Sequence, residues 1–282
     1  MIRRWSVLAL AVAIAVCFTL AAASNARAGA IISNGTVKLG VNDAGQLNFS
    51  DPVTGEYRGI TFVPTDNDGT RAGCPCEGWG AANVDVDPDK TFSGKANQDQ
   101  GGITGVTVTS FSATDSTAIS VTTLAGKLKV THDFRPFGST PNLYEVLVTL
   151  ENVGAEALAD VRYTRVMDWD VEPTATNEFV TIRRGNASAL LYSNDNGFDD
   201  NNPLGPRFPI DPASVNADLD HSGPADHGAL FDFGFGALAA GESKTFSIFY
   251  GAAATEAQAD AAVSAAGAEV FSYGQPRVRR RC

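Results

Sequence analysis

The clearest pattern in the chain is an alternation of apolar and polar residues, repeated in several runs between positions 105 and 171. Five runs share this pattern and are separated by short turns: residues 105–111, 118–123, 127–134, 144–150 and 158–171. Successive side chains of a β-strand point to opposite faces, so a two-residue period predicts strands with one buried face. Strands of this length and spacing predict an all-β fold, a large antiparallel β-sandwich.

Weaker β patterns flank this region. Residues 31–41 predict a first strand broken at Asn34-Gly35, and residues 46–49 are expected to pair back across a turn. Other short runs predict further strands: residues 57–63, 179–182, 189–192, 229–235, 244–251 and 269–273.

One helix and two long loops complete the prediction. Residues 255–268 are alanine-rich and follow the N-capping residue Thr255, which predicts one short C-terminal helix. Residues 66–80 and 194–228 are rich in Asp, Gly and Pro and are expected to be loops. A loop as long as the second is usually functional, or is held by something such as an ion.

The two ends of the chain differ from its body. Residues 1–28 have a basic start, an apolar run and the triplet Ala26-Arg27-Ala28, which predicts a cleaved secretory signal peptide; the alternative is a membrane anchor. Residues 29–276 are expected to form a single β-sandwich domain, and residues 277–282 a disordered basic tail. The protein is therefore expected outside the cell or in the cell envelope, with no stable membrane span after cleavage.

The net charge limits the classes of partner that this protein is expected to bind. Removing residues 1–28 takes away three arginines and no acidic residue, which lowers the formal charge from −11 to −14. The four arginines of the tail leave the remaining body at −18. So acidic a body argues against nucleic-acid binding, which needs a basic surface, and is compatible with binding divalent cations.

Three cysteines remain after signal cleavage: Cys74, Cys76 and Cys282. Cys74-Pro75-Cys76 leaves room for only a strained bridge, but in an oxidising compartment a structural disulfide is the leading expectation, within this pair or to Cys282. Free or intermolecular thiols and a metal pair are the alternatives, although zinc needs more ligands than these.

The run from Val161 to Thr174 contains more candidate functional side chains than any other stretch of the chain. In a strand, Asp168, Asp170 and Glu172 share one face, and their like charges are relieved by a cation, a basic partner or exposure to water. Neighbours on that face lie about 6.5 to 7 Å apart, which does not exclude acid–base cleavage of glycosides, but no partner motif completes an active site. Trp169 is expected in the core or as a platform for stacking a sugar.

Acidic turns supply candidate Ca²⁺ ligands, because Ca²⁺ prefers carboxylate and carbonyl oxygens. The segment Asp218 to Gly223 matches the first half of a calcium loop, but Ala229 stands where the motif requires Glu. Ordinary Asx turns are the alternative for each segment. The candidate ligands are Asp218, Asp220, Ser222, Asp226, Asp85, Asp87 and Asp89.

Nucleophile and phosphate-binding motifs are absent from the sequence. The three histidines are scattered, although His221 and His227 share the second long loop and could join a metal site there. The sequence therefore states no reaction. The row from Asp168 to Glu172 is best held as a candidate cation or ligand site beneath the 194–228 loop.

Three stretches carry a resemblance to known proteins: residues 132–154 (HDFRPFGSTPNLYEVLVTLENVG), the DVRYTRVMDWDVEPT run and the CPCEGWG loop. They resemble a set of uncharacterised secreted bacterial surface proteins, some of which carry a PEP-CTERM-type sorting tail. The resemblance implies export and a β-rich extracellular domain but no catalytic residues. Here Gln275-Pro276 runs directly into RVRRRC, so either the tail is missing or the C-terminus is an altered or truncated end.

A weaker likeness concerns the fold alone. The strand opening at Asn34-Gly35 and the run LAAGESKTFSIFYG look like the large sandwiches of galactose-mutarotase type, which accompany many carbohydrate-active enzymes. Fold likeness does not carry function, and the catalytic histidines of that type are not identifiable. The expected function is a non-enzymatic, secreted surface or matrix protein, steadied by Ca²⁺. The alternative is a carbohydrate-binding or carbohydrate-processing domain with glycan partners.

Overall fold

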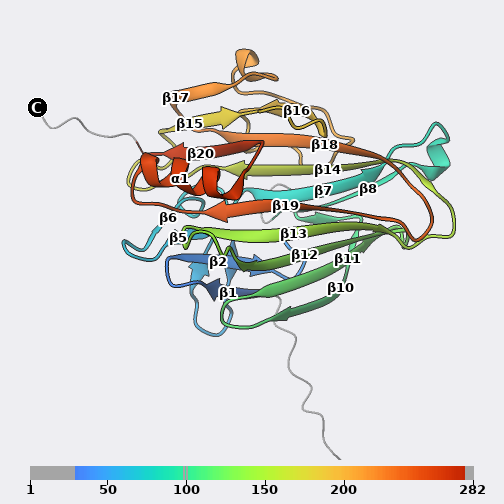
Figure 1. Ribbon diagram of the computed structural model, residues 1–282, viewed down its shortest axis with the longest axis horizontal. Helices are drawn as coiled ribbons and strands as arrows, with labels where there is room; N and C mark the ends of the chain where they lie inside the picture. The colour runs from blue at the N-terminus through green and yellow to red at the C-terminus, as the bar shows by residue number, and fades with distance from the viewer. Residues whose placement is uncertain (1–28, 98, 100, 277–282) are drawn as a thin grey trace, which may run out of the picture.

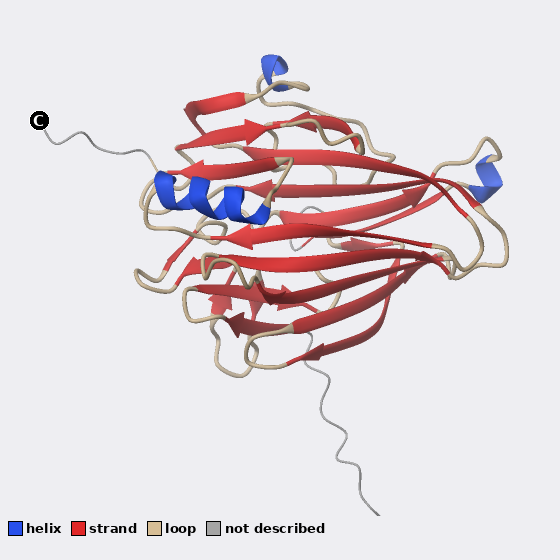
Figure 2. Ribbon diagram, viewed as in Figure 1, coloured by secondary structure: helices blue, strands red, loops and turns tan. Residues whose placement is uncertain are grey.

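The computed structural model describes residues 29–276 except 98 and 100, and within them it is built almost wholly from antiparallel strands (Figures 1 and 2). One large sheet has five strands, in the order β10 (Val106–Ala113), β11 (Ala118–Leu124), β12 (Leu128–Pro136), β13 (Leu143–Asn152) and β19 (Ser243–Gly251). The other has six, in the order β16 (Leu190–Asn194), β18 (Gly228–Leu238), β14 (Leu158–Asp168), β7 (Glu77–Asn83), β8 (Phe92–Asn97) and β9 (Ile103–Thr104).

Three smaller sheets complete the described fold. A four-stranded sheet contains β1 (Gly29–Ser33), β2 (Val37–Asn42), β5 (Ile60–Phe62) and β6 (Asn67–Asp68). A three-stranded sheet contains β17 (Leu219–Ala225), β15 (Glu178–Arg183) and β20 (Phe271–Gln275), and a two-stranded sheet contains β3 (Phe49–Ser50) and β4 (Tyr57–Arg58). Two 3₁₀ turns, η1 (Pro88–Lys90) and η2 (Pro212–Ser214), lie in connections.

One hydrophobic core joins the two large sheets and the four-stranded sheet. Each strand turns its apolar positions inward, as in Val146, Val148 and Leu150 of β13, and these meet Trp79 and Tyr163 from the other large sheet. Face-to-face packing of two sheets through alternating side chains is the definition of a sandwich. The predicted all-β sandwich is confirmed.

The short C-terminal helix is also confirmed. Helix α1 (Glu256–Ala266) begins after Thr255, whose side chain accepts a hydrogen bond from the Gln258 amide. It ends at Gly267 with φ 61°, the left-handed conformation that glycine adopts without steric cost. Among the described residues no helix has the length and apolar composition needed to cross a membrane.

Several local predictions were wrong. Asn34-Gly35 does not break one strand but turns the chain between β1 and β2, and residues 46–48 form no strand. The predicted 66–80 loop includes the start of β7, and the 194–228 loop includes β17. β7 escaped notice because its sequence, EGWGAAN, is buried at every position and so has no alternation.

Strand β14 is buried on both faces from Tyr163 to Asp168. Tyr163 faces the main core. Thr164, on the other face, lies beneath Arg207, which belongs to the connection between β16 and β17. We call this connection, residues 195–218, the 195–218 loop. A second, small apolar cluster of Val180, Ile182 and Ala229 joins the three-stranded sheet to the outer face of the six-stranded sheet. The outer face of β14 therefore lies under a further layer.

Candidate functional site

Three aspartates meet where β14 ends. Asp168 is the last residue of β14 and pairs in register with Gly228, the first residue of β18. Asp226 lies two residues before Gly228, in the turn from β17, so the register brings it to the same end of the sheet. Asp170 follows two residues after Asp168, with its backbone amide bonded to the Gly69 carbonyl at 2.8 Å. We call Asp168, Asp170 and Asp226 the acidic cluster.

The carboxylates of the acidic cluster are close together and largely hidden from water. One oxygen from each lies within 4.8 Å of those of the other two. Asp168 is 1 % exposed and Asp170 is fully buried, whereas Asp226 is exposed. None of the four oxygens of Asp168 and Asp170 accepts a hydrogen bond of ordinary geometry from a described residue. Buried polar atoms nearly always have a hydrogen-bond partner, so four neighbouring carboxylate oxygens without one are highly unusual.

Burial and the neighbouring negative charges make the ionised forms of Asp168 and Asp170 unfavourable. Burial, followed by the charges of Asp170 and Asp226, raises the pKa of Asp168. Burial likewise raises the pKa of Asp170. A buried carboxylate without a partner is strongly unfavourable, so the pair must hold a proton or a cation.

Neighbouring residues close the cluster from two sides. The Cα of Gly73 is so near that a Cβ added to it would lie 2.4 Å from both carboxylate oxygens of Asp170. Glu178, at the start of β15, is buried and accepts hydrogen bonds from the amides of Asn177 (3.0 Å) and His227 (3.2 Å). Burial raises the pKa of Glu178 to about 7. Glu178 is thus satisfied by the backbone, unlike Asp168 and Asp170.

The donor set of the acidic cluster suits a hard divalent cation. It offers carboxylate oxygens and no nitrogen or sulfur, which is the ligand type that Ca²⁺ and Mg²⁺ prefer. Two ligands on opposite sides of a Ca²⁺ ion lie about 4.6 to 5.2 Å apart, so oxygens within 4.8 Å fit around one ion. Of the three carboxylates, only that of Asp226 belongs to an exposed residue.

The other two ligand-binding candidates of this run, Glu172 and Trp169, do not join the cluster. Glu172 is half-buried, with a carboxylate oxygen 4.0 Å from an Arg71 guanidinium nitrogen. Trp169 is half-buried, packs between the main core and the small cluster, and donates its indole N–H toward Ser272 Oγ at 3.4 Å. The row was predicted as one strand face, but the strand ends at Asp168 and the chain then turns.

The Asp85–Asp89 turn forms a local structure of its own. Asp85 accepts a hydrogen bond from the Asp87 amide (2.9 Å), and Asp87 accepts one from the Asp89 amide (3.1 Å). Asp87 caps η1. These are the Asx turns that were the alternative to a metal site.

The segment that resembles a calcium loop is a strand instead. Asp218 accepts a hydrogen bond from the Arg184 amide at 2.9 Å, and Asp220 pairs with Arg183 at 2.6 Å. Ser222 lies in β17, opposite Val180 of β15. Of the predicted metal ligands, the structure brings only Asp226 to the acidic cluster.

Buried carboxylates hold the 195–218 loop in place. Asp195 accepts hydrogen bonds from the Ile210 amide (3.0 Å) and the Ser214 hydroxyl (2.7 Å). Burial alone would raise the pKa of Asp195, but these bonds and the nearby His227 ring lower it. Asp199 accepts one from the Phe208 amide at 2.8 Å. Asp195 and Asp199 therefore bind the backbone of the loop to which they belong.

Cys74 and Cys76 form a disulfide, as the leading expectation had it. Cys74 is half-buried and Cys76 is buried. The Cys76 carbonyl accepts a hydrogen bond from the Asp168 amide at 2.9 Å. Asp99, an exposed residue, lies close to both sulfurs.

A buried ion pair was missed by the sequence analysis. Arg165 of β14 contacts Glu77 of β7 at 2.6 Å inside the core, and Glu77 also accepts hydrogen bonds from the Tyr250 hydroxyl (2.6 Å) and the Leu47 amide (2.5 Å). The signal was present, because Arg165 interrupts an otherwise apolar strand face. A charge on a core face requires a buried partner.

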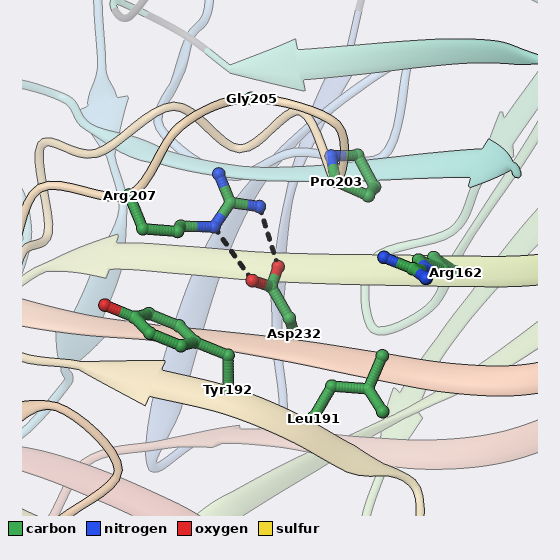
Figure 3. Close-up of a pocket in the computed structure, with 7 residues that line it drawn as sticks. All are labelled: Arg162, Leu191, Tyr192, Pro203, Gly205, Arg207 and Asp232. Carbon is green, nitrogen blue, oxygen red and sulfur yellow. Dashed lines mark hydrogen bonds and ion pairs between the residues drawn. The ribbon is translucent and has the colours of Figure 1, made fainter.

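A small pocket of about 180 Å³ lies on the outer face of the six-stranded sheet (Figure 3). Its charged residues already have partners, either within the pocket or beside it. Arg207 donates to both carboxylate oxygens of Asp232 at 2.8 Å each and to the Asp200 carbonyl, and Arg162 pairs with Asp160. Such a pocket has little free polar capacity for a ligand.

No protein-family model matches this chain, and no curated protein matches it significantly. The function must therefore be argued from the site.

Proposed function

We propose that this protein is a non-enzymatic β-sandwich of the cell surface or extracellular matrix, stabilised by Ca²⁺ bound at the acidic cluster. The observation that carries the proposal is the pair of buried, unpartnered carboxylates of Asp168 and Asp170 beside Asp226. When bound, the ion supplies positive charge where the fold has concentrated negative charge.

A cation explains the cluster better than shared protons do. Protons would neutralise Asp168 and Asp170, and one shared between them would engage an oxygen of each, yet the other two buried oxygens would still lack a donor. A Ca²⁺ ion takes about six to eight oxygen ligands, with water or backbone carbonyls completing the set. The exposed Asp226 gives the ion a route of entry from solvent.

A structural role suits the burial of these carboxylates. A hydrolase acting on a polymer needs its acid and base to face an open groove, whereas Asp168 and Asp170 lie beneath a further layer. The carbohydrate-binding alternative relied on Trp79 or Trp169 being free to stack on a sugar. Trp169 is half-buried and packs between the main core and the small cluster. Trp79 is fully buried and donates its indole N–H to the Ala44 carbonyl at 2.8 Å, so it is not free to stack on a sugar.

Thermal melting with and without divalent cations tests the proposal. Stripping the protein with EDTA should lower Tm, and Ca²⁺ should restore it. At a free concentration about 100-fold above Kd, a bound ion adds about 2.7 kcal/mol to the free energy of unfolding. For a chain of this size that corresponds to a rise in Tm of about 5 to 10 °C.

Two isosteric variants make the test specific. Asp170→Asn removes one charge from the acidic cluster and should abolish the Ca²⁺-dependent rise in Tm. Asp87→Asn, in the exposed turn, removes the same charge elsewhere and should retain the rise. The proposed site would be ruled out if the Tm of the wild type did not change with Ca²⁺. It would also be ruled out if Asp170→Asn retained the Ca²⁺-dependent rise in Tm.

A further inference from the structure

We propose that the Cys74–Cys76 disulfide is a reducible switch that sets the affinity of the acidic cluster for Ca²⁺. This inference rests on the proposed function and assigns its regulation. The disulfide and the cluster belong to neighbouring segments: Gly73 lies against the Asp170 carboxylate, and the Cys76 carbonyl accepts the Asp168 amide at 2.9 Å. The same short segment therefore holds both buried ligands.

The disulfide fixes the shape of this segment. Within it, the Cys76 amide bonds to the Cys74 carbonyl at 2.6 Å, and the Glu77 amide bonds to the Pro75 carbonyl at 3.1 Å. The tight turn leads from Gly73, at the cluster, directly into β7. A site held rigid in its binding geometry binds more tightly, because less conformational freedom is lost on binding. Opening the disulfide releases that constraint.

Two features of the Cys74–Cys76 disulfide favour its reduction: the short loop that it closes and the partial exposure of Cys74. Disulfide stabilisation by the chain-entropy argument grows with the length of the closed loop, and this loop contains a single residue between its cysteines. Cys74 is half-buried whereas Cys76 is buried, so an entering thiolate meets the Cys74 sulfur first. The Glu77 side chain just beyond it is anchored in the core, which confines the change to the segment before β7.

The exchange balances with a dithiol as the reductant. Its thiolate attacks Cys74 Sγ, the bond between the sulfurs breaks, and Cys76 leaves as a thiolate that takes up a proton. The second thiol of the reductant then displaces Cys74, which is also protonated. Two electrons and two protons pass to the protein, and the reductant becomes a cyclic disulfide.

Calorimetric titration of Ca²⁺ into the oxidised and the dithiothreitol-reduced chain tests this switch. Both arms carry Cys282→Ser, so that only one pair of sulfurs takes part. We expect reduction to raise Kd by about tenfold, within the usual range of coupling between two sites. Cys74→Ser with Cys76→Ser should bind like the reduced chain.

The reciprocal measurement does not depend on any cysteine variant folding. Thermodynamic linkage requires Ca²⁺ to raise the dithiothreitol concentration for half-reduction by the same factor, and Asp170→Asn should remove that protection. Equal Kd values in the two redox states, with no protection by Ca²⁺, overturn the switch but leave the proposed function standing. No Ca²⁺ binding in either state overturns both.

Discussion

Asp168 and Asp170 differ from the other acidic residues of this protein in what surrounds them. Asp195 and Asp199 are just as buried, but backbone amides and a hydroxyl satisfy them. The carboxyl groups of Asp168 and Asp170 face each other and Asp226 instead. Residue type is the same in both cases, so the contrast comes entirely from the hydrogen-bond donors within reach.

His132 is the opposite case, a basic residue kept neutral by the core. It is fully buried beside the Trp79 ring, with its Nε2 3.0 Å from the Tyr163 hydroxyl. Burial, followed by the charge of Arg165, holds the pKa of His132 well below its usual range.

This predicts a loss of stability in mild acid. Below about pH 6.5 the unfolded chain takes up a proton at His132 that the folded chain does not, so the free energy of unfolding falls as pH falls. The slope reaches about 1.4 kcal/mol per pH unit for one proton. Urea unfolding between pH 7.5 and 5, in excess Ca²⁺, should show it.

A variant at this position separates the histidine contribution from that of the carboxyl groups. His132→Gln should flatten the acid slope relative to wild type, because glutamine does not titrate. Identical slopes for wild type and His132→Gln would show that His132 is not the group responsible.

At the scale of elements, the 195–218 loop packs on the outer face of the six-stranded sheet and is bonded to several of its strands. Asn201 donates to the Trp79 and Ala96 carbonyls of β7 and β8, and Arg207 reaches Asp232 of β18. β7 accepts this contact because Gly80 has no side chain: a Cβ added there would lie 2.0 Å from the Asn201 carbonyl oxygen.

Gly80→Ala should therefore destabilise the fold. Its new methyl group meets backbone, which cannot rotate away, so the loop or the strand must shift. Overpacking of this kind costs about 1 to 3 kcal/mol. Denaturant unfolding gives the change in free energy, and Gly138→Ala is the matched control, because a Cβ added at that position meets no atom within 4 Å. Equal stability of the two variants would mean that the loop does not press on β7.

At the scale of the whole molecule, the fold places its negative charge unevenly. The acidic cluster lies at one end of the six-stranded sheet, at the junction of β14, β18 and the three-stranded sheet. A cation at that junction would tie elements that are far apart in the sequence.

Export is the prediction that belongs to this scale. Residues 1–28, which lie outside the described part of the chain, are predicted to direct secretion. Expression of the full chain in a bacterial host should give an exported protein beginning at Gly29, as judged by the mass of its N-terminal peptide. A protein that stays in the membrane with residues 1–28 attached would instead identify them as an anchor.

The sequence by itself determined the elements whose signal is local. Alternation located β10 to β14, and Thr255 with an alanine-rich run located α1, because a two-residue or helical period depends only on neighbours along the chain. It also marked Asp168, Asp170 and Asp226 as separate candidates for a cation site.

Only the tertiary structure decided what surrounds these residues. Burial of the second face of β14 depends on a loop and a sheet that arrive from residues 178–225 and from β20, and no pattern within β14 encodes them. The register of β14 with β18 then sets Asp226 beside Asp168, while Glu172 turns away toward Arg71. Contacts of this kind are long-range, and one residue of slip in the register would place different side chains together.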